Sequence, residues 1–136
     1  MEISLEPFDP KAMPPRLAVH RAFDVRQVRV ADAVIVEVIG EIDMSTAPKL
    51  AGAVSSVHET TRRVVVDLSE VSFLDSSALS ALVLCQRELV ERAIEFSVVC
   101  PEHSPARRAL EITALIGPLA VIETLDAALA PAALPG

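Results

Sequence analysis

The hydrophobic pattern between residues 25 and 39 indicates two short strands. From Val25 to Val30 the side chains divide between two alternating faces, Val25, Gln27 and Arg29 against Arg26, Val28 and Val30. β-Branched side chains dominate from Ala33 to Ile39. Ala31 and Asp32 form a two-residue link between these segments. Because alternation around a tight link is typical of a β-hairpin, we predict that the folded part of the chain begins with one.

A helical period follows. Ser45 and Thr46 stand before Pro48, and hydroxyl side chains followed by an early proline predict a helix start. We expect this helix to run to about His58. Its apolar positions recur at steps of three and four, which predicts one buried face; they are Leu50, Ala53, Val54 and Val57.

The middle of the chain predicts a strand, a helix and a second strand. Residues 63–68 are almost continuously apolar, which is typical of a central strand covered on both faces. A helical pattern runs from Ser76 to about Ala93, and another buried strand at residues 96–100 ends before Pro101. Such a unit predicts parallel strands joined by a right-handed crossover.

The last elements are shorter. Ser104, which precedes a proline, predicts the start of a third helix that continues to about Ile112. Residues 120–122 predict a last strand, and Thr124 predicts the start of a final helix to about Ala130.

These elements predict one α/β domain at residues 23–130, with a small mixed sheet of about four to five strands flanked by about four helices. Residues 1–22 contain several prolines and no sustained periodicity, so we expect a flexible N-terminal arm. Residues 131–136 are expected to form a C-terminal tail.

Charge and composition narrow the range of functions. A net charge of −7, with basic residues scattered in short pairs, argues against direct nucleic-acid binding. No apolar run approaches the roughly 18 residues of a membrane helix, and the start lacks the layout of a signal peptide. We expect a cytoplasmic protein without membrane insertion, monomeric when alone although an oligomer stays open, whose partner is a protein or a small ligand.

Cysteine and histidine give no sign of a metal site. Cys85 and Cys100 lie singly inside apolar segments, which favours small core residues over a disulfide or a zinc site. His20, His58 and His103 are widely separated, and no second histidine or cysteine lies four residues from any of them. We predict neither a metal nor another cofactor.

The start of the central helix carries the candidate chemistry. Asp75 and Ser76 are both good N-cap residues, although one would suffice to satisfy the free amides of the first turn. The run Asp75, Ser76 and Ser77 also places hydroxyls beside the positive end of a helix dipole. This junction would therefore tolerate serine phosphorylation without unfolding.

The two faces of this helix differ. The inward stripe is expected to contain Leu79, Leu82, Val83, Leu89, Val90 and Ala93. Gln86 falls within it and needs a hydrogen-bond partner unless the covered region ends there. The outer strip of Ser77, Ala81 and Leu84 is small and apolar before it reaches Glu88. A single exposed leucine is ordinary, but next to the serine turn this strip is a candidate partner contact.

Three segments, in this order, resemble those of a bacterial anti-sigma factor antagonist of the STAS domain family. They are Gly-Glu-Ile-Asp at residues 40–43 with the helix start after it, Val-Val-Val-Asp-Leu-Ser at residues 64–69, and Val-Ser-Phe-Leu-Asp-Ser-Ser-Ala-Leu at residues 71–79. The resemblance spans roughly residues 25–129 and implies a small sheet flanked by helices.

The resemblance also implies a mechanism. In the family an ATP-dependent serine kinase, itself the anti-sigma factor, phosphorylates the serine after the loop aspartate, which here is Ser76, with Ser77 as the alternative. Asp43 and Asp75 match positions near the kinase contact. The unphosphorylated form would bind the kinase and free a sigma factor, and a phosphatase would reset the phosphorylated form. Ala78 departs from the usual family glycine. Alanine is the better helix former, so the helix should be firmer, whereas a loop that needs close backbone approach by a kinase would be hindered.

Phosphorylation would act through charge. A phosphoserine adds about −1.5 to −2 charge at neutral pH. It would lie beside Asp75 and is expected near Asp43 and Asp67 as well. At a packed interface this dianion would have to be paired or desolvated, so the partner would be released.

Three alternatives stay open. The first is a STAS scaffold or accessory subunit of a transport or stress-sensing assembly that has no phosphorylation cycle. The second is an enzyme with a serine nucleophile, although the chain has neither a Gly-x-Ser-x-Gly elbow nor an obvious base. The third is nucleotide binding, for which neither glycine-rich fingerprint is present.

Overall fold

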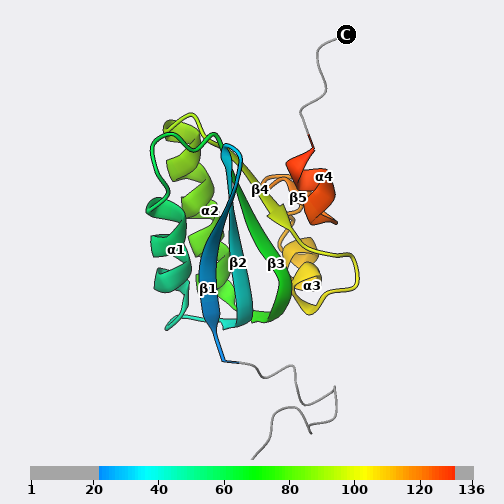
Figure 1. Cartoon of the computed structure of the whole chain (residues 1–136). Coiled ribbons are helices and arrows are strands. Elements are labelled where there is room, and N and C mark those ends of the chain that lie inside the picture. Colours follow the sequence, from blue (N-terminus) through cyan, green and yellow to red (C-terminus); the bar gives the residue numbers. More distant parts are fainter. Residues whose placement is uncertain (1–21, 131–136) are drawn as a thin grey trace, which may run out of the picture.

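The computed structural model describes residues 22–130 and contains one five-stranded sheet with helices on both faces (Figure 1). In chain order the elements are β1 (Asp24–Val30), β2 (Ala33–Ile42), α1 (Ala47–Ser55), β3 (Arg63–Leu74), α2 (Ser76–Glu91), β4 (Glu95–Val99), α3 (Pro105–Ile112), β5 (Val121–Ile122) and α4 (Leu125–Leu129). The predicted α/β class and mixed sheet are confirmed. The predicted tail, and all of the predicted arm except Ala22, lie outside the described residues.

The strands follow one another across the sheet in chain order. β1 and β2 form the predicted hairpin, in which Ala31 adopts a positive φ of 54° at the turn. All later neighbours pair in parallel. Ile42 is paired with Leu74, so β2 and β3 end side by side, and the chain leaves that edge of the sheet towards α1 and α2.

Two hydrophobic clusters hold the helices to the sheet. α1 and α2 cover one face, where Leu50 and Leu82 are fully buried against the sheet valines. α4 lies on the other face, where Ala128 packs with Val65 and Val99 (Figure 1). The central strands are thus covered on both faces, as their apolar run predicts.

Two predicted boundaries differ from the structure. β3 continues six residues beyond Leu68, because β2 keeps pairing with it through two register shifts as far as Leu74. α1 ends at Ser55 rather than near His58. The Arg92 guanidinium binds the carbonyls of Ser55 and Val57, at 3.1 Å and 3.0 Å, and takes these acceptors away from a continuing helix.

The buried stripe of α2 is rotated from the predicted one. Its fully covered members are Ala78, Leu82, Cys85 and Leu89. Val90, predicted to face inward, is 64% exposed, and Ala93 is exposed with a φ of 58° just after the helix. The helix turns towards α1 as well as towards the sheet, so Cys85 takes a core position. Gln86 finds its partner in the carbonyl of Pro118.

Candidate functional site

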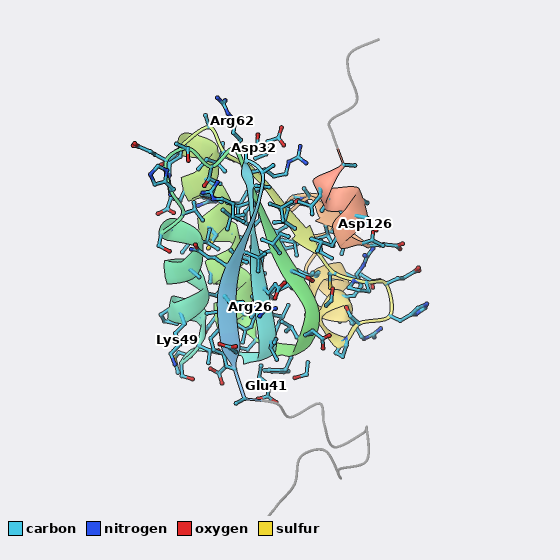
Figure 2. The ribbon with its side chains drawn as sticks, viewed as in Figure 1. Arg26, Asp32, Glu41, Lys49, Arg62 and Asp126 are labelled. Carbon is cyan, nitrogen blue, oxygen red and sulfur yellow. The ribbon has the colours of Figure 1, made fainter. Side chains whose placement is uncertain are left out.

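The turns that precede α1 and α2 meet at the carboxyl ends of the neighbouring strands β2 and β3. The backbone amide of Asp75 donates a 3.2 Å hydrogen bond to the carbonyl of Ile42, the residue before Asp43. Both helices therefore begin beside the paired strand ends of β2 and β3. Glu41 and Lys49 lie at this end of the molecule, and Asp32 and Arg62 lie at the opposite end (Figure 2).

Asp75 caps α2. Its Oδ1 accepts a 3.0 Å hydrogen bond from the amide of Ala78, which satisfies one of the free donors of the first turn. Ser76 is the first residue of the helix and is exposed, and within residues 22–130 its hydroxyl has no hydrogen-bond partner. Ser77 is half-buried. The cap thus belongs to Asp75, and the Ser76 hydroxyl faces solvent beside the helix N-terminus.

A second carboxylate organises the neighbouring turn. Asp43 Oδ1 accepts hydrogen bonds from Ser45 Oγ at 2.7 Å, from the Ser45 amide at 2.9 Å and from the Thr46 amide at 3.1 Å. The side-chain hydrogen bond of Ser45, followed by its backbone hydrogen bond, lowers the pKa of Asp43 below the ordinary value of 3.8. Asp43 is therefore ionised at neutral pH.

The start of α1 differs from the predicted cap. Thr46 occupies the N-cap position but makes no side-chain cap to the helix. Its Oγ1 instead accepts a 2.8 Å hydrogen bond from the amide of Asp43. The Thr46 hydroxyl and the Asp43 carboxylate thus each accept a hydrogen bond from the other residue's amide, and these bonds stabilise the turn. The backbone hydrogen bond between Asp75 and Ile42 places the turn of Asp43 beside the turn of Asp75, next to the serine at which the phosphate is expected.

Asp67 does not belong to this site. It lies in the middle of β3, opposite Glu37 and Val99, and accepts hydrogen bonds from Ser69. Seven strand positions separate it from Leu74, which corresponds to about 23 Å along an extended strand. The expectation that a phosphate on Ser76 would lie near Asp67 is therefore wrong, because β3 is longer than its apolar run suggested.

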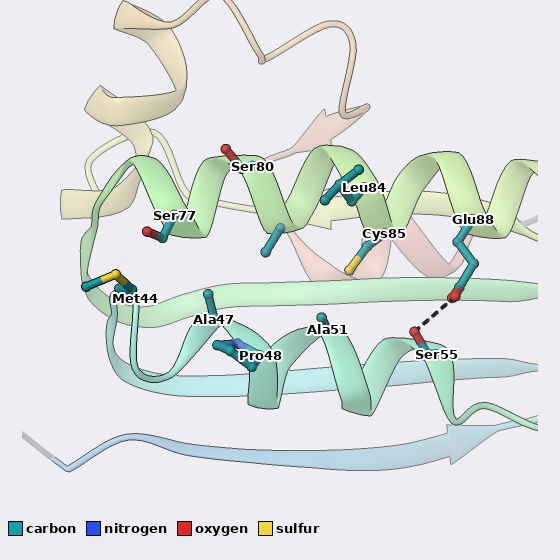
Figure 3. Close-up of a pocket in the computed structure, with 11 residues that line it drawn as sticks. Met44, Ala47, Pro48, Ala51, Ser55, Ser77, Ser80, Leu84, Cys85 and Glu88 are labelled. Atoms are coloured by element: carbon teal, nitrogen blue, oxygen red, sulfur yellow. Dashed lines mark hydrogen bonds between the residues drawn. The ribbon is translucent and has the colours of Figure 1, made fainter.

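A groove of about 470 Å³ runs between α1 and α2 from this edge (Figure 3). One wall contains the predicted outer strip of Ser77, Ala81 and Leu84. The other wall comes from α1 and the turn before it and was not predicted; its members are Met44, Ala47, Pro48 and Ala51. Small side chains on facing helices are the signal that indicates such a gap, but only once the two helices are known to be neighbours.

Large apolar side chains border the groove. Met44 is 77% exposed and Leu84 is 62% exposed. Cys85 lies at its floor, where burial, and then the charge of Glu88, raise the pKa of the thiol to about 11. The thiol is therefore protonated at neutral pH, and the floor of the groove is uncharged.

Among residues 22–130, polar contacts hold the two helices together only at the end of the groove away from Ser76. Ser55 Oγ donates a 3.2 Å hydrogen bond to Glu88 Oε1, and Arg92 binds the carbonyls that follow α1. Glu88 Oε2 is buried and accepts no hydrogen bond from the described residues. Its ion pair with Arg92 spans 3.9 Å, which is too long for a hydrogen bond.

Ala78 does not obstruct the serine turn. Its side chain is fully buried in the core beneath α2, so its methyl group is not presented to a docking protein. The expected hindrance at this position is therefore absent from the structure. Within the described part of the chain, no group of three or more His, Cys, Asp or Glu side chains is placed to hold a metal ion. Nor is any helix among residues 22–130 long and apolar enough to cross a bilayer.

Comparison with known proteins gives consistent relatives. Residues 24–128 match the STAS domain family. Proteins named anti-sigma-B factor antagonist from Listeria monocytogenes and Listeria innocua are each 36% identical over 89 residues, which cover 64% of this chain and 76% of theirs. The crystal structure of an anti-sigma factor antagonist from Mycobacterium paratuberculosis superimposes with a TM-score of 0.71 at 34% identity. That match covers 79% of this chain and 92% of the other.

Proposed function

The chain belongs to the STAS domain family, and from this premise we propose that it is an anti-sigma factor antagonist switched by phosphorylation of Ser76. The names of the relatives from Listeria and Mycobacterium support the antagonist role. In this proposal the unphosphorylated chain binds an anti-sigma factor that is a serine kinase, and the bound sigma factor is set free.

One observation carries the choice of Ser76. Asp75 already supplies the N-cap of α2, so the hydroxyl of Ser76 is exposed and has no structural task among the described residues. Its position at the first turn lets amides and the helix dipole stabilise a phosphate there. Ser77, half-buried at the mouth of the groove, is the second choice.

Release follows from the charges around this position. A phosphate on Ser76 would stand beside Asp75 and the turn of Asp43, in a chain that already carries a net charge of −7. The free protein can solvate this charge, but a partner packed against the same edge would have to desolvate or pair it. The phosphorylated chain therefore leaves the kinase, and a phosphatase restores binding.

The test uses the purified cognate kinase with Mg-ATP and intact-mass measurement. Wild type and Ser77→Ala should gain one phosphate, and Ser76→Ala should gain none. The unphosphorylated chain should bind the kinase and release the sigma factor, and the phosphorylated chain should do neither. A kinase complex that persists after phosphorylation would favour the STAS scaffold instead. Addition of phosphate to a Ser76→Ala, Ser77→Ala double variant would refute the assignment of both serines.

A further inference from the structure

We infer that the groove between α1 and α2 receives an amphipathic helix of the anti-sigma partner, with apolar side chains between the two helices and a lysine or arginine over Glu88. This inference rests on the proposed function, because the groove begins at Ser77, next to the proposed phosphorylation site. It extends the docking surface from the serine turn to the full length of the α1–α2 cleft.

The shape of the groove fits apolar side chains. Alanines at positions 47, 51 and 81 leave a volume of about 470 Å³ between the helices, and its floor contains the uncharged thiol of Cys85. Met44 and Leu84 stand exposed at its borders. Wide, mostly apolar grooves with exposed anchors at the rim are typical of surfaces that bind the apolar face of a helix.

The charges indicate a basic occupant. Asp43 and Asp75 flank the end near Ser76, and Glu88 lies at the other end. The Arg92 guanidinium donates its hydrogen bonds to the carbonyls of Ser55 and Val57. Among the described residues, Glu88 Oε2 therefore receives no hydrogen bond. The Glu88 side chain as a whole is 43% exposed at this end of the groove, so its carboxylate can be approached by a new cationic donor. A lysine or arginine of the partner would supply it.

The length of the groove also suits a short partner helix. Ser77 and Glu88 mark the ends of the groove on α2, and eleven residues of helix correspond to about 16 Å. Three turns of a partner helix span the same distance. They would place apolar side chains at steps of three and four along the groove and a basic side chain at the Glu88 end.

The experiment measures the affinity of the full chain for the purified cognate kinase at two salt concentrations. Ala51→Leu and Ala81→Leu fill the groove and should each weaken binding about tenfold, the loss expected when a buried anchor is excluded. Glu88→Gln should weaken binding and reduce its dependence on salt. Ile112→Ser and Glu91→Gln, at exposed positions outside the groove, are the matched controls and should bind like wild type. Thermal unfolding of each variant confirms the fold.

The outcomes separate this inference from the proposed function. If wild type binds the kinase and the filled variants bind equally well, the groove inference is wrong and the proposed function stands. If wild type does not bind the kinase at all, the proposed function fails. Two further results would give the groove another occupant and overturn the inference: a dimer of the chain alone that Ala51→Leu abolishes, or saturation of the groove by a synthetic peptide of residues 1–21.

Discussion

The amide of Asp75 is hydrogen-bonded to the carbonyl of Ile42 at 3.2 Å, so a backbone contact joins the turn before α2 to the turn before α1. The link does not depend on either acidic side chain. Substitutions of Asp43 or Asp75 should therefore change charge and capping at the site without separating the two turns, which allows these effects to be measured one at a time.

Replacing Asp75 by alanine should destabilise the protein by about 1 kcal/mol, because the amide of Ala78 loses its cap. Asparagine can accept the same hydrogen bond, so Asp75→Asn should retain most of the stability. Urea unfolding of the three proteins measures the difference. Equal stability of the alanine variant and wild type would contradict the capping role.

Ser76→Glu should weaken kinase binding while it changes the free energy of unfolding by less than about 0.5 kcal/mol, as expected for an exposed surface position. The new charge lies at a helix N-terminus, where it is tolerated. Arg62→Gln is the control, since it makes the same change in net charge at the opposite end of the molecule (Figure 2). If Arg62→Gln weakens binding as much, the effect is due to net charge rather than to the position of Ser76.

Asp43 should titrate below 3.8, and Ser45→Ala should raise this pKa, because the hydroxyl of Ser45 is the main cause of its lowering. A carboxyl whose pKa is lowered by folding contributes stability above its unfolded-state pKa and loses that contribution as pH falls through the folded-state pKa. The Asp43 contribution is thus complete at neutral pH and is lost below about 3.8. An NMR titration of the side-chain carboxyl carbon measures the pKa directly. An unchanged midpoint in Ser45→Ala would refute the assigned cause, and Ser80→Ala serves as the control.

Arg92→Ala should destabilise the protein by about 1–3 kcal/mol, because the carbonyls of Ser55 and Val57 lose their charged donor. Arg87→Ala removes the same charge from an exposed position on the same helix and should have little effect. Chemical denaturation compares the two variants. Similar losses in both would indicate that helix propensity or net charge, rather than the bond to the end of α1, determines the result.

Much of the fold could be predicted from local patterns. The hairpin at Ala31 and the parallel unit around α2 each depend on short local patterns, and the structure confirms them. Of the two candidate caps, Asp75 and Ser76, Asp75 is the one that caps the helix. The predicted element boundaries were wrong where residues distant in the sequence determine the length of an element. Pairing with β2 lengthens β3, and the guanidinium of Arg92 ends α1 early.

The candidate site likewise has one part that local sequence predicts and another part that depends on how distant residues pack. The exposure of Ser76 and the closeness of Asp43 to Asp75 could be predicted, because short motifs placed both turns at strand ends. The groove could not, since nearly half of its lining comes from α1 and the turn before it, and its width depends on how the two helices pack. Residues such as Ala51 have no local signal that distinguishes a groove wall from an ordinary helix surface.

In the described part of the chain, the polar contacts that join α1 to α2 involve Ser55, Val57, Glu88 and Arg92, at one end of the helices. Met44, near the other end, and Leu84, midway along α2, are exposed and take no part in these contacts, so both can vary at little cost to folding. If the chain acts as proposed, duplicated copies of this domain that differ at those positions would bind different anti-sigma partners. Parallel signalling pathways built on the same scaffold would then stay insulated from one another.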